Sequence, residues 1–449
     1  MKPLRNHADA IRRRLTVGIA RPAELCAFAD ISQPTFWRTL QTLGDEILSF
    51  GATRAIRYAL RDRTRMADIP VYRVDEAGNT HHVGVLIAVK PEGFLLQETD
   101  GKSQHSDGLP WWLDGMRPQG YLGRVWAQQH AHALALSPHL SDWQHEPACI
   151  LRALLQEGDD LPGNLLLGDA MRARFHNTPV SPALSLTARR QHYVQLAQQI
   201  ASGNIPASSV AGEQPKFTTY AMTAQGARHL IVKFSELPEN EVTERWRDLL
   251  LAEYHALQTL GAAGIAAAET SILDHGGQRF LEIVRFDRVN AKGRLALHSL
   301  TALDAEYIGK APAGWPTITR LLAADRHITR AAADGAALLW AYGELIGNND
   351  RHNGNLSFIG EHRPYDLAPA YDISPMCFAP RSSGGMNNDL PAATIHPEIA
   401  PRIWRRALPL AQTFLQRLQR ENRFSPRFEP CIAALAQHIA AAQETITHL

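Results

Sequence analysis

A lysine inside a strongly apolar segment is the feature that most constrains the fold of this chain. The segment "HLIVKF", residues 229–234, has the branched and aromatic residues of a buried strand, and Lys233 lies within it. A buried ammonium group is unfavourable unless it meets an anion, so a buried Lys233 indicates a phosphate partner. An edge strand, with Lys233 extending into water, is the alternative that this segment alone leaves open.

A helix is expected directly after this strand, over residues 241–265, ending at Gly261 or Gly264. Glu253 lies on this helix among apolar neighbours. In protein kinases, a strand lysine is held toward the nucleotide phosphates by a glutamate on a helix that follows it. Lys233 and Glu253 have that order and approximately that spacing. We therefore expect these two residues to pair beside a nucleotide.

Two flanking segments contain further candidate contacts to a nucleotide. Residues 205–222, "IPASSVAGEQPKFTTYAM", are rich in small residues, which let the backbone approach a ligand and turn N–H groups toward phosphate oxygens. The spacing is not that of a Walker loop, and alone such a segment is most often a surface turn. Residues 279–290 predict a strand whose backbone serves as an adenine-binding hinge. The candidate ATP contacts are Ser209, Val210, Ala211, Gly212, Gln214, Lys216, Lys233, Glu253, Glu282, Val284 and Phe286.

The loop "GNNDRHNGNLSF", residues 347–358, concentrates charged and amide side chains after an apolar helical segment. Asp350 and Asn355 are five residues apart, the interval between the catalytic aspartate and the metal-binding asparagine of protein kinases. Such an aspartate accepts or orients the proton of the attacking hydroxyl, and an asparagine oxygen suits Mg²⁺. Asp372 follows seventeen residues later, in the place of the second magnesium-binding acid. Asp350, Lys233 and Asn355 are thus the catalytic candidates, and Asn355 and Asp372 the metal ligands.

Each of these signals has an ordinary explanation when it is taken alone. Loops rich in aspartate and asparagine are common without any catalytic role. The conjunction is harder to explain by coincidence, because a small-residue loop, a strand lysine, a helix glutamate, an Asp-x4-Asn pair and a later aspartate follow one another in one order. That order favours ATP- and Mg²⁺-dependent phosphoryl transfer.

The first 65 residues differ from the rest in charge. They contain twelve lysines and arginines against six acidic residues, in a chain whose net charge is only +1. Their pattern predicts three short helices and then two strand arms around Gly51, which is the element order of a winged helix-turn-helix. A basic segment with this order suggests DNA as a partner.

In a winged helix-turn-helix, the third helix enters the major groove and the wing meets phosphates. The candidate DNA contacts are Gln33, Thr35, Trp37, Arg38 and Gln41 on the third helix, with Arg54 and Arg57 on the wing. The alternative is a small helical dimerisation or docking module whose arginines are simply solvated. A winged helix often acts as a dimer, but the sequence does not fix the oligomeric state.

Composition excludes several other classes of protein. The chain has no apolar run of about eighteen residues, so a membrane span is not expected. Its first residues lack the apolar core of a secretory signal. The four cysteines are scattered without paired spacing, which argues against a disulfide framework or a zinc site and suits a reducing cytoplasm.

The chain resembles the HipA family of bacterial serine/threonine toxin kinases. The resemblance spans roughly residues 70–449 and is carried by "SSVAGEQPKF", "HLIVKF", "AEYHALQTLGAAGI", "VRFDR", "IGNNDRHNGNLSF" and "LAPAYDISP", with "LPWWLDGMRPQGYLGR" similar to the family's amino-terminal subdomain. It implies phosphorylation of serine or threonine in a protein, with ATP and Mg²⁺. It also places at Ser209 the family's loop serine, which can itself become phosphorylated and displace the loop from the site.

The resemblance, added to the pattern, implies an α+β, two-lobed HipA/protein-kinase-like fold with an N-terminal winged helix-turn-helix. The expected regions are a DNA-binding head at residues 1–65, a middle region of a small β meander and helices at 66–180, a kinase N-lobe at 181–290 and a helical C-lobe at 291–449.

Two departures from the family matter for function. Val284 stands where the family commonly has a glutamate, so the hinge contact must come from the backbone or from Glu282. Relatives usually pair with a separate DNA-binding antitoxin, whereas a DNA-binding candidate is fused here. The need for an antitoxin is therefore open, and the head either binds an operator or inhibits the kinase in cis. Two further alternatives are a transcription regulator with a nucleotide-sensing body and a Mg²⁺-dependent DNA-cleaving toxin.

Overall fold

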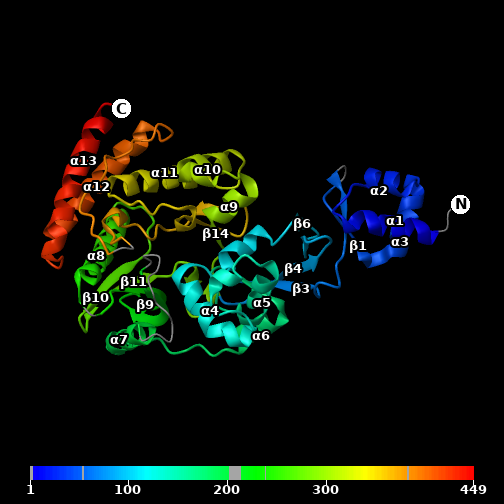
Figure 1. Cartoon of the computed structure of the whole chain (residues 1–449), viewed down its shortest axis with the longest axis horizontal. Helices are drawn as coiled ribbons and strands as arrows, with labels where there is room; N and C mark the ends of the chain where they lie inside the picture. The colour runs from blue at the N-terminus through cyan, green and yellow to red at the C-terminus, as the bar shows by residue number, and fades with distance from the viewer. Residues whose placement is uncertain (1–3, 53–54, 202–213, 238, 382–383) are drawn as a thin grey trace.

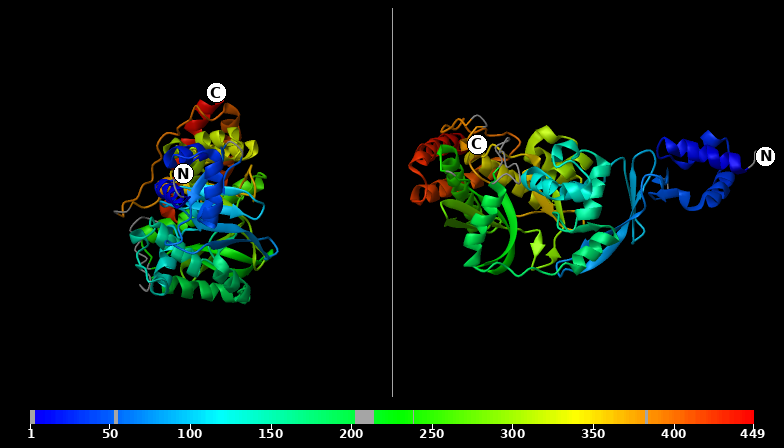
Figure 2. Two further views of the ribbon diagram at one scale, coloured as in Figure 1. Left: turned by 90° about the vertical axis from the view of Figure 1, so that its right-hand side faces the viewer. Right: turned by 60° about the horizontal axis from the view of Figure 1, so that its bottom comes forward.

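The computed structural model describes residues 4–52, 55–201, 214–237, 239–381 and 384–449. Figure 1 shows an elongated molecule, with the N-terminal helices at one end and the C-terminal helices at the other. The right-hand view of Figure 2 shows the head apart from the lobes and joined to them through the strands of the middle region. Among the residues so described, no helix is both long and apolar enough to cross a membrane.

The head, residues 1–65, contains the three helices and the two strand arms that the sequence predicts. Its core is formed by fully buried Ile11, Leu25 and Phe36, one from each helix. A proline in the first turn opens the second and third helices, where a missing N–H is tolerated. The elements are α1 (Leu4–Thr16), α2 (Pro22–Ala29), α3 (Gln33–Leu43), η1 (Gly44–Glu46), β1 (Ile47–Phe50) and β2 (Arg57–Leu60).

The middle region is a five-stranded antiparallel sheet with helices beside it. Its strand order is β6-β5-β4-β3-β7, so the predicted meander is present and β7 joins it from a distant part of the chain. The elements are β3 (Ile69–Val74), β4 (Thr80–Ala88), β5 (Phe94–Glu98), β6 (Ser103–Ser106), η3 (Trp111–Met116), α4 (Gly120–Leu134), η4 (Leu140–Asp142), α5 (Pro147–Glu157), β7 (Leu165–Leu167) and α6 (Gly168–Asn177).

The head hairpin packs directly on this sheet. Leu48 and Ala59 of the hairpin share one buried cluster with Ile87 and Leu95 of the sheet. The backbone continues the contact, since Lys90 N–H donates to the Leu60 carbonyl and Asp62 N–H to the Ala88 carbonyl, both at 2.8 Å. The Lys90 ammonium also lies 2.8 Å from the buried Asp62 carboxylate. The head is thus attached through a packed interface and not through its covalent linker alone.

The N-lobe, residues 181–290, is built on a four-stranded antiparallel sheet of order β10-β11-β9-β8. Alternate residues of β9 face opposite sides, so Val232 and Phe234 pack with Tyr193 of α7 while Lys233 points toward α8. The elements are α7 (Ala188–Ala201), β8 (Lys216–Thr223), β9 (Gly226–Phe234), α8 (Glu241–Ala262), β10 (Thr270–His275), β11 (Gln278–Val284) and β12 (Arg288–Val289).

The C-lobe, residues 291–449, is mainly helical. Its core is centred on the buried rings of Trp315, Tyr342, Trp404 and Phe414, and it includes residues of the two C-terminal helices. The elements are β13 (Gly293–Arg294), β14 (Leu297–Ser299), α9 (Leu300–Tyr307), η5 (Ala311–Ala313), α10 (Gly314–Ala324), α11 (Arg330–Leu345), η6 (Asn353–Asn355), β15 (Ser357–Ile359), β16 (Asp366–Leu367), η7 (Met376–Phe378), α12 (Pro401–Arg420), η8 (Pro426–Phe428) and α13 (Glu429–Thr447).

Candidate active site

Lys233 is at the centre of a buried charge cluster. Its strand, β9, lies between β11 and β8, so the alternative of an edge strand is wrong. The side chain is 9% exposed, and its ammonium lies 2.7 and 2.8 Å from the two carboxylate oxygens of Glu253 and 2.5 Å from Oδ1 of Asp372. The predicted Lys233–Glu253 contact is therefore present, and both negative partners stabilise the charged amine.

Glu253 reaches this cluster from the middle of α8. The helix begins at Asn240, whose side chain accepts hydrogen bonds from the N–H groups of Val242 and Thr243. Farther along, α8 packs through Leu250 against β11. Burial raises the pKa of the Glu253 carboxyl, and the ammonium of Lys233 opposes that effect. The helix thus delivers a carboxylate that depends on Lys233 for its charge.

Asp372 contributes the second carboxylate of the cluster, and it comes from the C-lobe. It has a φ of 52°, a left-handed conformation that is uncommon for residues other than glycine and that often marks functional sites. The segment before it is fixed by pairing, because Ala370 N–H donates to the Ala266 carbonyl at 2.9 Å. Burial alone raises the pKa of Asp372, but the charges of Lys233 and then Lys216 outweigh it and lower the pKa to about 2. Asp372 is therefore an anion at neutral pH.

The loop that holds Asp350 and Asn355 follows the end of α11. Gly347, with a φ of 76°, lets the chain turn there, and Asn348 N–H donates back to the Gly343 carbonyl at 2.8 Å. The buried Asn348 side chain then accepts the N–H of Asp350 at 3.0 Å. Asn355 donates its amide to the backbone carbonyl of Asp350 at 2.8 Å and to its carboxylate at 3.5 Å. These bonds use the amide nitrogen of Asn355, so its side-chain oxygen is the atom left to meet a cation.

Asp350 is half-exposed, with 51% of its side chain accessible. Burial raises the pKa of its carboxyl, His352 opposes this effect, and the negative charge of Asp372 adds to it. Asp350 and Asp372 are therefore electrostatic neighbours and do not lie on separate surfaces. A partly accessible carboxylate whose pKa is raised, beside a second carboxylate that stays ionised, has the properties of a general base.

Part of the predicted nucleotide loop belongs to the described residues and part does not. Ser209, Val210, Ala211 and Gly212 lie outside the described residues. Gln214 donates its amide to the Phe234 carbonyl, which ties the start of β8 to the end of β9. Lys216 pairs with Lys233 across the two strands, so both side chains share one face of the sheet. Its charge reaches both Asp372 and Glu253.

The side chain of Glu282 is not brought to this cluster, and its predicted contact with the nucleotide is wrong. It lies opposite Val232, on the face of the sheet away from Lys233. There it is buried, accepts the Tyr193 hydroxyl at 2.9 Å and pairs with Arg189 at 3.0 Å. β11 is buried on both faces, so its sequence contains no alternation that could show which way Glu282 points.

The other two hinge candidates lie closer to the cluster. The backbone N–H of Val284 donates to the Glu269 carbonyl at 2.8 Å, so that group is already used. The ring of Phe286 lies 5.6 Å, between centroids, from the ring of Tyr371, the residue before Asp372. Phe286 therefore borders the site, while Val284 contributes mainly to the sheet.

Part of the same segment joins the N-lobe to the middle region. Arg288 is buried and donates to the carbonyls of Leu161 and Gly163 at 2.7 and 3.0 Å. It also pairs with Asp160 at 3.0 Å and with Asp287 at 2.7 Å. Arg288 thus has an interdomain role that the sequence did not reveal, because it depends on a loop more than a hundred residues earlier.

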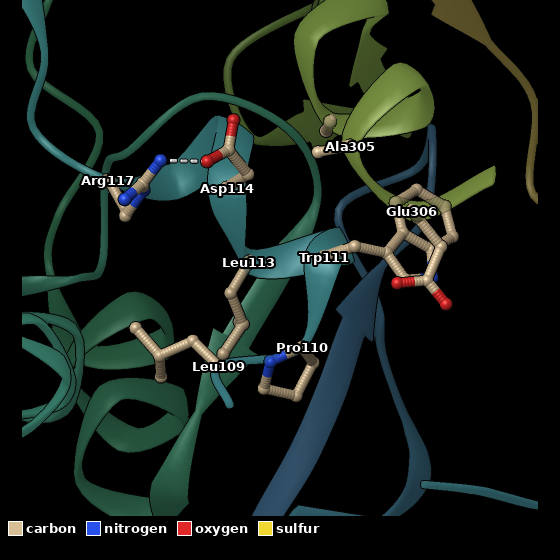
Figure 3. Close-up of a pocket in the computed structure, with 9 residues that line it drawn as sticks. Leu109, Pro110, Trp111, Leu113, Asp114, Arg117, Ala305 and Glu306 are labelled. Carbon is tan, nitrogen blue, oxygen red and sulfur yellow. Dashed lines mark hydrogen bonds and ion pairs between the residues drawn. The ribbon is translucent and has the colours of Figure 1, made fainter. Parts of the chain in front are cut away.

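A separate pocket lies between η3 of the middle region and α9 of the C-lobe (Figure 3), with a volume of about 220 Å³. Its walls include Leu109, Trp111, Glu306 and an ion pair between Asp114 and Arg117. None of the lining residues belongs to the Lys233 cluster. The convergence of the Lys233, Glu253 and Asp372 side chains, and not the depth of a pocket, locates the candidate active site.

In the head, three of the predicted DNA contacts share the exposed face of α3. Trp37, Arg38 and Gln41 are exposed, and Trp37 retains 50% of its surface. Gln33 at the start of α3 is also exposed. Thr35 is half-buried, and its hydroxyl lies 3.1 Å from that of Ser32 in the first turn. The structure therefore presents α3 outward, with Thr35 engaged in local contacts.

The two strand arms of the predicted wing are present as the antiparallel pair β1 and β2. Arg54 lies outside the described residues. Arg57 pairs with Phe50, whose ring is stacked on His105 of the middle sheet at 5.1 Å. Burial lowers the pKa of His105, and the Arg57 charge contributes to the same effect. Arg57 thus stands beside the middle region, and its side chain is exposed.

Comparisons with known proteins agree with this architecture. The YjjJ-like toxin middle domain matches residues 65–176, and the HipA-like C-terminal domain matches residues 208–442. Toxin YjjJ of Escherichia coli (strain K12) is 37% identical over 422 residues, covering 93% of this chain and 94% of that protein. A chain from the Shewanella oneidensis MR-1 complex of HipA, HipB and operator DNA superposes with a TM-score of 0.55 and 15% identity, covering 85% of this chain and 97% of its own. The chain therefore belongs to the HipA-like toxin family.

Proposed function

We propose that this protein is an ATP- and Mg²⁺-dependent serine/threonine protein kinase that acts as a toxin. The observation that carries the proposal is the convergence of Lys233, Glu253 and Asp372, with Asp350 as an electrostatic neighbour of Asp372. Residues from a strand, a helix and two distant loops meet there with the order of charges that phosphoryl transfer requires.

The residues present fit a magnesium nucleotide. Mg²⁺ prefers oxygen ligands and usually takes one or two from the protein, with phosphate and water completing its shell. Asn355 and Asp372 offer that set, and among the described residues no group of three or more histidine, cysteine, aspartate or glutamate side chains suggests another metal. Lys233 and Lys216 would face the phosphates, and the bound nucleotide would supply the phosphoryl group.

Asp350 would act on the protein substrate. Its carboxylate would accept the proton of a serine or threonine hydroxyl while that oxygen bonds to the γ-phosphorus of ATP and the bond from that phosphorus to the departing ADP breaks. Lys233 and the metal held by Asn355 and Asp372 would balance the negative charge that shifts to the leaving group. The half-exposed position of Asp350 leaves room for a substrate hydroxyl.

The test is transfer of γ-labelled phosphate from ATP to bacterial proteins, with DNA nicking measured in parallel without ATP. Wild-type protein should label protein, Asp350→Ala should bind nucleotide without labelling, and Asp325→Ala, at an exposed position of the C-lobe, should behave as wild type. Nucleotide binding with no labelling by the wild type would instead support a sensory body. Nicking that needs Mg²⁺ but not ATP would support DNA cleavage.

A second role, DNA binding by the head as a winged helix-turn-helix, is supported by the exposed face of α3. Trp37, Arg38 and Gln41 are available there, and the superposed relative comes from a complex that contains operator DNA and HipB. This head would let the protein recognise DNA itself, alone or with an antitoxin. Binding of a labelled duplex from upstream of the protein's own gene tests it, and no binding at low salt would reject it.

Autophosphorylation of Ser209 is a further part of the proposal, by resemblance. Incubation with ATP and Mg²⁺ should add the mass of one phosphate, located by peptide mapping. Asp350→Ala should remain unmodified. An active wild-type preparation whose Ser209 stays unmodified would contradict this part alone.

A further inference from the structure

Two side chains from outside the candidate catalytic loop hold its backbone. Trp315, fully buried at the start of α10, donates its indole N–H to the His352 carbonyl at 3.1 Å. Tyr371, the residue before Asp372, donates its hydroxyl to the Gly354 carbonyl at 3.0 Å. Both carbonyls lie between Asp350 and Asn355, so each bond acts on the peptide that sets the distance between these two residues.

The proton positions around Tyr371 follow from its neighbours. Its hydroxyl oxygen also lies 2.7 Å from the hydroxyl of Ser357. A tyrosine has one hydroxyl proton, and a carbonyl can only accept, so Tyr371 donates to Gly354 and Ser357 donates to Tyr371. A tyrosine hydroxyl, with an ordinary pKa of about 10, is protonated at neutral pH and can donate. The result is a directed chain of bonds from β15 to the loop.

Trp315 is held rigidly where it meets the loop. Its ring packs edge-on against Trp340 at 5.6 Å within the C-lobe core. Four residues earlier, the Ala311 carbonyl accepts the side-chain amide of Asn353 at 3.3 Å. The segment 311–315 therefore meets the loop at two points, and neither bond involves a group that would touch a nucleotide or a metal.

We infer that Trp315 and Tyr371 are positioning residues that fix Asp350 relative to Asn355 from two sides. The inference rests on the proposed kinase function for its catalytic consequence. The loop has only the short turn η6 as regular structure, and Asp350 is half-exposed, so the outside bonds add to the bonds within the loop in fixing where its carboxylate lies. Displacing such a group by about 1 Å costs about a hundredfold in rate, and loss of one of two supports should cost about tenfold.

Two pairs of conservative variants test this. Tyr371→Phe removes only the O–H that bonds the loop. Trp315→Phe removes the N–H that bonds the loop together with part of the indole ring, a loss of volume that Trp404→Phe reproduces elsewhere in the core. The matched controls are Trp404→Phe and Tyr342→Phe, because both residues are fully buried in the same core and bond carbonyls outside the loop, those of His396 at 3.5 Å and Ala256 at 3.2 Å. Both loop variants should lower kcat about tenfold, with the Kd for nucleotide unchanged within about twofold. The controls should keep wild-type kcat.

Amide hydrogen exchange in the full-length protein gives a readout that does not need activity. The N–H groups of Asp350 and Asn355 are bonded within the loop and report on its opening. Loss of one outside hydrogen bond should speed their exchange about fivefold, and the controls should not. If the wild-type protein has no kinase activity but the two loop variants exchange faster than it does, the kinase proposal is rejected and the positioning role remains supported. Exchange no faster than in the controls, or unchanged kcat in an active protein, would overturn the inference.

Discussion

The ion pairs of the candidate active site are buried and join distant segments, whereas the ion pair chosen from the head is exposed. In the active site, Lys233 is 9% exposed and its partners come from positions 20 and 139 residues away along the chain. In the head, Arg63 and Asp45 are 61% and 66% exposed, and they lie 18 residues apart. Buried ions are strongly destabilised when a partner is removed, while exposed pairs contribute about 0–1 kcal/mol. One residue should therefore matter greatly in the site and little in most of the head.

Part of the positive charge of the head is neutralised by ion pairs with acidic residues of the head. Arg12 pairs with Glu46, and Arg61 and Arg63 both pair with Asp45. The excess of positive charge in residues 1–65 is thus unevenly available, and Arg38 on the exposed face of α3 bonds only local groups on its own helix among the described residues. Counting charges along the sequence does not distinguish an arginine that can meet DNA from one that holds the head together.

The largest effect is expected for catalysis by Asp350. Asp350→Ala should lower kcat for phosphotransfer by about 10²–10⁴-fold, because a positioned general base typically contributes that much. Nucleotide affinity should remain close to wild type, measured by calorimetry on the same preparation. If Asp350→Ala keeps the wild-type kcat, Asp350 is no more important for activity than an ordinary exposed residue, and the proposed role as general base is rejected.

The next effect is on stability. Lys233→Met leaves Glu253 and Asp372 without their shared cation and should lower the free energy of unfolding at pH 7 by about 3–5 kcal/mol, measured by chemical denaturation. Arg63→Ala, which breaks an exposed pair, should change it by less than about 1 kcal/mol. Similar changes in the free energy of unfolding for the two variants would contradict the expected difference between buried and exposed ion pairs.

A smaller effect is expected for DNA binding. Arg38→Ala should weaken binding of the head to duplex DNA by about 1–3 kcal/mol and reduce the dependence of affinity on salt. Arg63→Ala is the matched control, since Asp45 already neutralises that charge. Equal losses in the two variants, measured by fluorescence anisotropy, would mean that net charge and not the face of α3 determines affinity.

The smallest effect concerns the pH dependence of activity. Asp350 must be ionised to accept a proton, and its pKa is raised, so kcat/KM should fall as the pH drops through a value above the ordinary aspartate pKa of about 3.9. His352→Asn removes a nearby positive charge that lowers the pKa of Asp350, so the acidic limb should move to higher pH. A limb that moves to lower pH would show that Asp350 is not the group being titrated.

Much of the fold follows from local patterns in the sequence. The apolar run around Lys233, the helix with Glu253, the turn at Gly347 and the three helices of the head each depend on neighbours within a few residues. The order of the motifs also indicated the family, which the comparisons confirm. These features are readable because strand burial, helix periodicity and turn chemistry are short-range properties.

The tertiary structure decided the contacts that join distant segments. It turned Glu282 away from Lys233, placed Arg57 beside the middle sheet, and brought Trp315 to the His352 carbonyl across 37 residues. It also set Asp372 in a left-handed conformation. Such contacts depend on the register of paired strands and on the packing of whole elements, which sum many weak interactions over the chain. The sequence by itself therefore determined which chemical groups are present and in what order, and packing determined which of them meet.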